Sequence, residues 1–173
     1  MKTFIVGFAL GLIVLPLVLY CYFSLGFAPV ATGAPEMPFE KQLARLARRS
    51  RIRREMPKMA PVSADEPNLL VGAGIYRQQC ALCHGLPSQD PTATAKGMFP
   101  KPPQLFRGKG VTDNAPGETY WKAANGIRLS GMPGFSTSLS ETQLWQVSLL
   151  LANANRLPLS VRSRLTTNPS ELP

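Results

Sequence analysis

The residues with the clearest chemical potential are Cys80, Cys83 and His84, in the stretch GIYRQQCALCHGLP. Two thiols stand three positions apart, and the only histidine of the chain follows at once. On a helical turn, residues three apart share a face, so both sulfurs would point the same way. Such a set suits half of a zinc site, a thiol redox pair, or covalent attachment of haem.

The first two possibilities lack supporting residues. A structural zinc ion usually takes four Cys or His ligands, and the remaining cysteine, Cys21, lies inside a long apolar run. A redox pair of the thioredoxin type needs strands alternating with helices, whereas the segment before Cys80 has a helical pattern. Haem fits better, because two sulfurs on one face can add to the vinyl groups along one porphyrin edge. The sequence therefore predicts one covalent haem c, which would also supply core to a small chain.

An iron held by His84 on one face needs a second ligand on the other. The thioether of Met, paired with His, is a known haem ligand that raises the reduction potential. Met132, in LSGMPGF, lies 48 residues after His84 among Gly and Pro residues that favour a tight loop against a flat ring. Met98 is 14 residues after His84, and the chain must pass around the ring edge to reach the opposite face. We therefore predict Met132 as the ligand, with a core-filling role as the alternative.

Helical signals flank this chemistry. The segment NLLVGAGIYRQQCALCHG has Asn68 as a possible N-cap and Gly85 as a stop. A stretch with little regular structure follows, because it is interrupted by many prolines. These prolines are Pro87, Pro91, Pro100, Pro102 and Pro103.

Two further helices are predicted towards the C-terminus. GETYWKAANG reads as a short helix closed by Gly126. SETQLWQVSLLLANANRLP begins with a capping-box pattern at Ser140 and Gln143, and Pro158 would end it. No stretch alternates convincingly enough for a strand, so the predicted fold class is all-α.

Together these residues resemble a class I cytochrome c over 69–158. The resemblance rests on CALCH, on GMPGF, and on four residues of the first and last helices, which are Gly72, Tyr76, Cys80 and Trp145. It implies a small all-α cytochrome c fold wrapped around one covalent haem. It also implies that Gly72 lets the first and last helices cross closely and that Tyr76 and Trp145 fill the crossing.

The resemblance further implies a proline carbonyl that holds the ring of His84 through its other nitrogen, which fixes the tautomer. Pro102 and Pro103 are both candidates, and the sequence does not choose between them. Partners for the haem propionates are sought among Tyr120, Trp121 and Arg128.

The N-terminal part has a different character. No Asp, Glu, Lys, Arg or His occurs from Thr3 to Pro35, and a membrane span needs about 20 apolar residues. We therefore predict a transmembrane anchor over 1–27. A cleaved signal sequence remains the alternative.

Three further regions follow the anchor. A linker is expected over 28–67, the cytochrome domain over 68–158, and a flexible tail over 159–173. The linker contains a basic segment, either a solvated spacer or an interfacial helix on anionic headgroups. Its apolar residues recur near helical spacing at Leu43, Leu46, Ala47 and Ile52.

The charge distribution indicates the partners. The chain carries a net charge of +9, but eight of its nineteen cations lie between Lys41 and Lys58. This juxtamembrane position favours a membrane surface and excludes nucleic acid as a partner. The domain 68–158 has a net charge of +4, which favours redox protein partners with acidic docking surfaces.

The resemblance implies haem attachment outside the bacterial cytoplasm. We therefore expect an inner-membrane protein whose cytochrome domain faces the periplasm or the cell exterior. The cations after the anchor oppose this orientation, although Lys41 lies about 18 residues beyond the apolar core, at the margin of that rule.

The predicted function is single-electron transfer between respiratory partners, not enzymatic catalysis, because His84 and Met132 would fill both axial positions of the iron. One alternative is a haem subunit of a larger membrane dehydrogenase or oxidase. Another is a haem sensor or enzyme with a labile Met ligand, for which the chain offers no second histidine as an acid or base.

Overall fold

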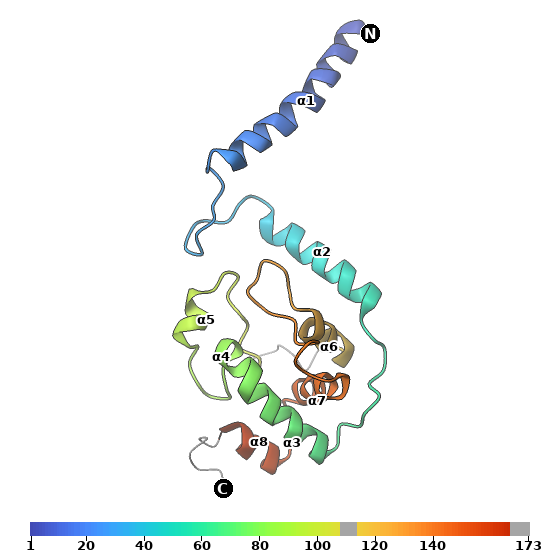
Figure 1. The fold of residues 1–173 in the computed structure, drawn as a ribbon, viewed down its shortest axis with the longest axis vertical. Coiled ribbons are helices and arrows are strands. Elements are labelled where there is room, and N and C mark those ends of the chain that lie inside the picture. The colour runs from blue at the N-terminus through green and yellow to red at the C-terminus, as the bar shows by residue number, and fades with distance from the viewer. Residues whose placement is uncertain (108–113, 167–173) are drawn as a thin grey trace. The chain divides into compact units, whose positions relative to one another are not determined.

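The computed structural model describes residues 1–107 and 114–166. Contacts group the chain into two compact units, Met1–Ala44 and the part from Arg45 onwards. Within the described residues every regular element is a helix (Figure 1). The only strand-like pairing among these residues is an isolated bridge between Ile127 and Met132. The predicted all-α fold class is confirmed.

Helix α1 (Lys2–Ser24) forms most of the first unit and has no buried residue. It is long and apolar enough to cross a membrane, since 23 residues at 1.5 Å each extend about 35 Å. Pro16 lies inside the helix, as membrane helices tolerate. The predicted N-terminal apolar helix is therefore present and supports membrane anchoring.

The first helical segment of the second unit carries the cysteines. Helix α3 (Glu66–Ile75), the π-helical turn η1 (Tyr76–Cys80) and helix α4 (Ala81–His84) follow one another without a break. Gly85 ends the run with a φ of 72°, as predicted. The predicted cap was wrong: Asp65 is the N-cap and accepts a hydrogen bond from the Asn68 backbone N–H, because Glu66 and the following proline already occupy the first turn.

Helix α7 (Glu141–Ala152) starts with the predicted capping box of Ser140 and Gln143. It ends earlier than predicted. Asn153 caps it, and its side-chain amide donates to the Leu149 carbonyl at 2.8 Å. The helix is closed by this local polar contact, so Pro158 is not its stop.

Helices α3 and α7 cross closely, as the resemblance implied. A Cβ on Gly72 would collide with the backbone carbonyl of Gln146, so only glycine permits this approach. Beside it, the Gln146 side-chain amide donates to the Asn68 side chain at 2.9 Å. The crossing is thus held by close backbone contact and by one polar cross-link.

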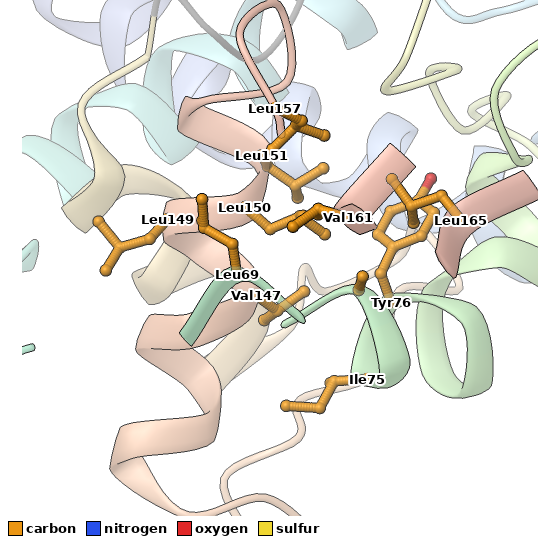
Figure 2. Close-up of a cluster of buried hydrophobic side chains, with 11 residues drawn as sticks. Leu69, Ile75, Tyr76, Val147, Leu149, Leu150, Leu151, Leu157, Val161 and Leu165 are labelled. Atoms are coloured by element: carbon orange, nitrogen blue, oxygen red, sulfur yellow. The ribbon is translucent and has the colours of Figure 1, made fainter. Parts of the chain in front are cut away.

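The main core surrounds this crossing (Figure 2). It is a cluster of buried hydrophobic side chains, and their burial stabilises the domain. The cluster consists of Leu69, Ala73, Ile75, Tyr76, Val147, Leu149, Leu150, Leu151, Leu157, Val161 and Leu165.

The prediction of a flexible tail over 159–173 was wrong for its first half. Residues Leu159–Thr166 form helix α8, whose Val161 and Leu165 are fully buried in the core of Figure 2. Residues four apart on a helix share a face, and this face completes the cluster against α3. Residues 167–173 lie outside the described residues.

Two shorter helices cover the rest of the domain. Helix α5 (Ala93–Gly97) lies within the stretch expected to be irregular, and Thr92 caps it through a hydrogen bond from the Ala95 N–H. Helix α6 (Pro116–Asn125) ends at Gly126, as predicted. It packs along α7.

The basic segment of the predicted linker is a helix, α2 (Glu40–Glu55). Its Ile52 is buried, with 3% of its surface exposed. The apolar stripe predicted from Leu43, Leu46, Ala47 and Ile52 is therefore divided, because Leu43 and Leu46 are more than 60% exposed.

Candidate haem site

The π-helical turn η1 delivers Cys80 to the start of α4, which carries Cys83 and His84. Both thiols are half-buried, and neither forms a disulfide. Single π-helical turns inside α-helices are frequent at functional sites. The sequence predicted a regular α-helix here, and no local sequence signal indicates that residues Tyr76–Cys80 form a wider π-helical turn.

Cys80 differs from a reactive redox thiol. Burial raises the pKa of Cys80 to about 12, and the neighbouring Cys83 adds to the shift. Because the thiolate is the form that attacks a disulfide, a thiol with so high a pKa is a poor redox nucleophile at neutral pH.

The ring of His84 has a defined orientation. Its Nδ1 lies 2.8 Å from the carbonyl oxygen of Pro103, so of the two predicted prolines the structure pairs Pro103, and not Pro102, with the imidazole. A carbonyl only accepts, so Nδ1 carries the proton and Nε2 keeps its lone pair. Burial lowers the pKa of His84, opposed in part by the Pro103 hydrogen bond. A neutral imidazole with a free Nε2 is the form that binds metal.

Tyr76 supports the residue after His84. Its side chain is fully buried, and its hydroxyl donates to the Gly85 carbonyl at 2.6 Å. Its ring meets Phe106 edge to face, with centroids 4.9 Å apart. Burial raises the pKa of Tyr76, which keeps the hydroxyl protonated as a donor. Sequence reasoning assigned Tyr76 only to the helix crossing and missed this hydrogen bond.

The loop that carries Pro103 is fastened at two points. Thr92 donates through its hydroxyl to the Leu82 carbonyl at 2.6 Å, which ties the start of α5 to α4. Arg107 donates to the Gln89 carbonyl at 2.7 Å. These contacts hold the carbonyl of Pro103 beside His84.

Met132 lies in a more open loop. Its carbonyl accepts from the Ile127 N–H at 3.0 Å, and its own N–H donates to the Ser130 hydroxyl at 3.3 Å. The side chain is half-buried. Within the described residues no recorded interaction joins Met132 to His84, Cys80 or Cys83, so its ligation of iron stays a prediction.

Met98 reaches the same loop. A Cβ on Gly131 would lie 2.8 Å from the Met98 methyl carbon. Sequence spacing made Met98 the weaker ligand candidate, and it gave no sign that Met98 packs beside the residue preceding Met132.

Two of the three residues suggested as propionate partners, Tyr120 and Trp121, have other contacts. Tyr120 stacks on Trp145, with ring centroids 4.4 Å apart. The Trp121 indole donates to the Glu55 carboxylate at 3.1 Å. Arg128 is exposed. Trp145 is thus buried against α6 through Tyr120.

This combination of helices around CxxCH defines the class: the chain carries a class I c-type cytochrome domain. Residues 67–149 match the family described as "Cytochrome C oxidase, cbb3-type, subunit III". A cytochrome c domain over these residues indicates haem binding and electron transport. The free thiols and the neutral imidazole described above fit that group.

No curated protein matches the chain. Among solved structures, the chain is similar to one from the "Kuenenia stuttgartiensis reducing HAO-like protein complex Kustc0457/Kustc0458", with 24% identity and a TM-score of 0.49. The match covers 58% of this chain and 49% of the other, so the chain spans about half the length of that relative.

Proposed function

We propose that this protein is a membrane-tethered monohaem cytochrome c that passes single electrons between respiratory partners. The observation that carries the proposal is the neutral His84 ring, held at Nδ1 by Pro103 with Nε2 free, directly after two free thiols. When bound, haem supplies a one-electron couple at its iron.

The chain's own residues have separate roles in this proposal. Cys80 and Cys83 would hold the haem through thioether bonds, and His84 would bind the iron through Nε2. Pro103 keeps the imidazole in the tautomer that leaves Nε2 unprotonated and raises its basicity. Met132 would be the second iron ligand and would raise the potential. An iron bound by both residues would have no site for substrate, which favours a carrier over an enzyme.

Helix α1 would hold the cytochrome domain at the bacterial inner membrane, with the domain in the periplasm or outside the cell. Tethering raises the effective concentration of the carrier near membrane partners. The positive charge of residues 68–158 favours partners with acidic docking surfaces.

Covalent attachment can be tested by haem staining after denaturing electrophoresis of protein made with a haem-attachment system. The full-length protein should keep its haem, and the double variant Cys80→Ser/Cys83→Ser should lose it. Cys21→Ser is the matched control, since Cys21 lies in α1, and it should stain as the wild type. Haem retained by the double variant under denaturing conditions would contradict the proposal.

A second candidate function is that of a haem subunit in a larger oxidase or dehydrogenase. The family description, which names an oxidase subunit, favours it. Purification in mild detergent at high salt distinguishes the two. A stoichiometric partner that survives both conditions would support the subunit role, and a lone protein of full haem content would support the free carrier.

A further inference from the structure

Helix α2 has an inner face that belongs to the cytochrome unit. Ile52 is 3% exposed, and Glu55, three residues later on the same side, accepts a hydrogen bond from the Trp121 indole of α6 at 3.1 Å. Arg51 also forms an ion pair with Glu55 at 2.6 Å. The C-terminal half of α2 is therefore attached to the domain.

Pro57, two residues after the end of α2, strengthens this attachment. The carbonyl of Pro57 occupies the place that a Cβ on Gly117 would fill. Gly117 lies in the first turn of α6 and is buried. A hydrogen bond at Glu55 and a close backbone approach at Pro57 thus hold residues 55–57 on α6.

The opposite face of α2 has the reverse character. Leu43 lies nine residues before Ile52, which at 3.6 residues per turn is two and a half turns, so it points away from the buried side. Leu46 shares that side and is 64% exposed. The outer face of α2 consists of Leu43, Leu46, Ser50, Arg53 and Arg54.

This composition suits a lipid surface. Neither arginine of the outer face forms an ion pair within residues 1–107 and 114–166. Exposed leucines beside unpaired arginines are typical of a helix at the headgroup boundary, where the leucines enter the apolar layer and the arginines meet anionic lipids. An acidic protein surface would match the arginines but leave the leucines in water.

The chain also carries a candidate membrane anchor close to α2 in the sequence. Helix α1 ends at Ser24 and α2 begins at Glu40. Residues 25–39 reach about 50 Å when fully extended, which keeps α2 close to any bilayer that holds α1.

We propose that the outer face of α2 lies on the anionic surface of this bilayer, and that the contact of residues 55–57 with α6 transmits this placement to the cytochrome domain. The domain is then held in one orientation at the membrane and is not free on a flexible tether. This orientation of the domain at the membrane does not depend on which residues bind the iron.

The lipid contact is tested with a nitroxide at Leu46→Cys, in the Cys21→Ser background, on the full-length holoprotein in nanodiscs. The discs contain phosphatidylcholine alone or with phosphatidylglycerol. Accessibility of the label to oxygen, relative to a water-soluble nickel chelate, should rise in the anionic discs. Replacing Arg53 and Arg54 by Gln should weaken surface binding about fivefold per arginine.

The controls use exposed positions elsewhere in the domain. A label at Leu159, which is 82% exposed, should stay water-accessible in both discs, and Arg128→Gln/Arg162→Gln should leave the Leu46 signal unchanged. A Leu46 label as water-accessible as the Leu159 label in anionic discs would overturn the proposal. Protection that appears only after addition of an acidic protein would also overturn it.

Transmission to the domain is tested by linear dichroism of the haem band in oriented anionic bilayers. The wild type should be dichroic. Gly117→Ala displaces Pro57 and should abolish most of the dichroism, while the absorption spectrum and the Leu46 label stay unchanged. Gly74→Ala, where an added Cβ meets nothing within 4 Å, should behave as the wild type.

If Gly117→Ala does not fold, Trp121→Phe removes only the indole donor and should reduce the dichroism in part. An isotropic wild type, or full dichroism in every variant with a folded spectrum, would refute the transmission of orientation.

Discussion

The two sides of the candidate haem site are built differently. On the His84 side, the imidazole meets Pro103 at 2.8 Å, and the buried Tyr76 hydroxyl holds Gly85 at 2.6 Å. On the other side, Met132 is held by hydrogen bonds to Ile127 and Ser130 within its own loop, whose neighbouring residues are exposed. One side belongs to the core, and the other is a local loop.

Because of this difference, substitutions on the two sides should affect different properties, the stability of the fold on one side and the redox properties of the iron on the other. Regions with few buried contacts open at low free energy, whereas core elements open only with global unfolding. Changes on the His84 side should therefore reduce the free energy of unfolding. Changes on the Met132 side should alter the iron while the fold persists.

The largest expected effect comes from Met132→Ala. Loss of the thioether ligand should lower the reduction potential on the order of 0.2 V, within the roughly 0.8 V that axial ligands span, and open the iron to carbon monoxide. Potentiometric titration measures this change. Met59→Ala is the control, since Met59 is 83% exposed. An unchanged potential in Met132→Ala would disprove the ligand assignment.

Gly72→Ala should give the next largest effect, on the His84 side. The added Cβ collides with the Gln146 carbonyl, and such overpacking costs about 1–3 kcal/mol of unfolding free energy. Chemical denaturation followed by circular dichroism measures it. Gly74→Ala, two residues along the same helix with open space around it, should be neutral or stabilising. Equal losses in both variants would show that the crossing is not close.

Tyr76→Phe tests the hydrogen bond to Gly85. It leaves a buried carbonyl without its donor, which should reduce the free energy of unfolding by about 1–2 kcal/mol. Tyr120→Phe, whose hydroxyl forms no recorded hydrogen bond within the described residues, should change it by less than about 0.5 kcal/mol. If the two variants are equally stable, the hydroxyl of Tyr76 does not support the site.

The smallest effect is expected from Met98→Ala, which removes the methyl group packed against Gly131. Because Met98 is half-buried, the variant should lose about 1 kcal/mol of unfolding free energy. The loop of Met132 should open more often, so the reduced Met98→Ala variant should bind carbon monoxide slowly, whereas the wild type should not bind it. Met98→Leu keeps the volume and should resist the gas as the wild type does. Absence of binding in Met98→Ala would remove Met98 from the support of this loop.

Local rules predicted much of the architecture. The stops at Gly85 and Gly126 and the capping box at Ser140 depend only on neighbouring residues, and they were found. The choice between Pro102 and Pro103 depends on where the chain returns in space, which spacing alone cannot give. The same holds for the Tyr76 hydrogen bond.

Helix α8 was not predicted for a different reason. Pro158 was taken as the end of the preceding helix and of the folded domain, yet proline also suits the start of a helix. Leu157, Val161 and Leu165 recur every four residues, and this spacing was the available signal. Ile52 was grouped with the exposed Leu43 and Leu46 because the sequence of an arginine-rich helix does not show which side is buried.

The central claim is that the iron has both axial positions filled by the chain. It is tested most directly by the absorption spectrum of the reduced full-length protein, with and without carbon monoxide. We predict that the spectrum does not change on addition of the gas, because His84 and Met132 would occupy both sites. A prompt shift of the haem bands would contradict the claim and indicate an open or labile iron.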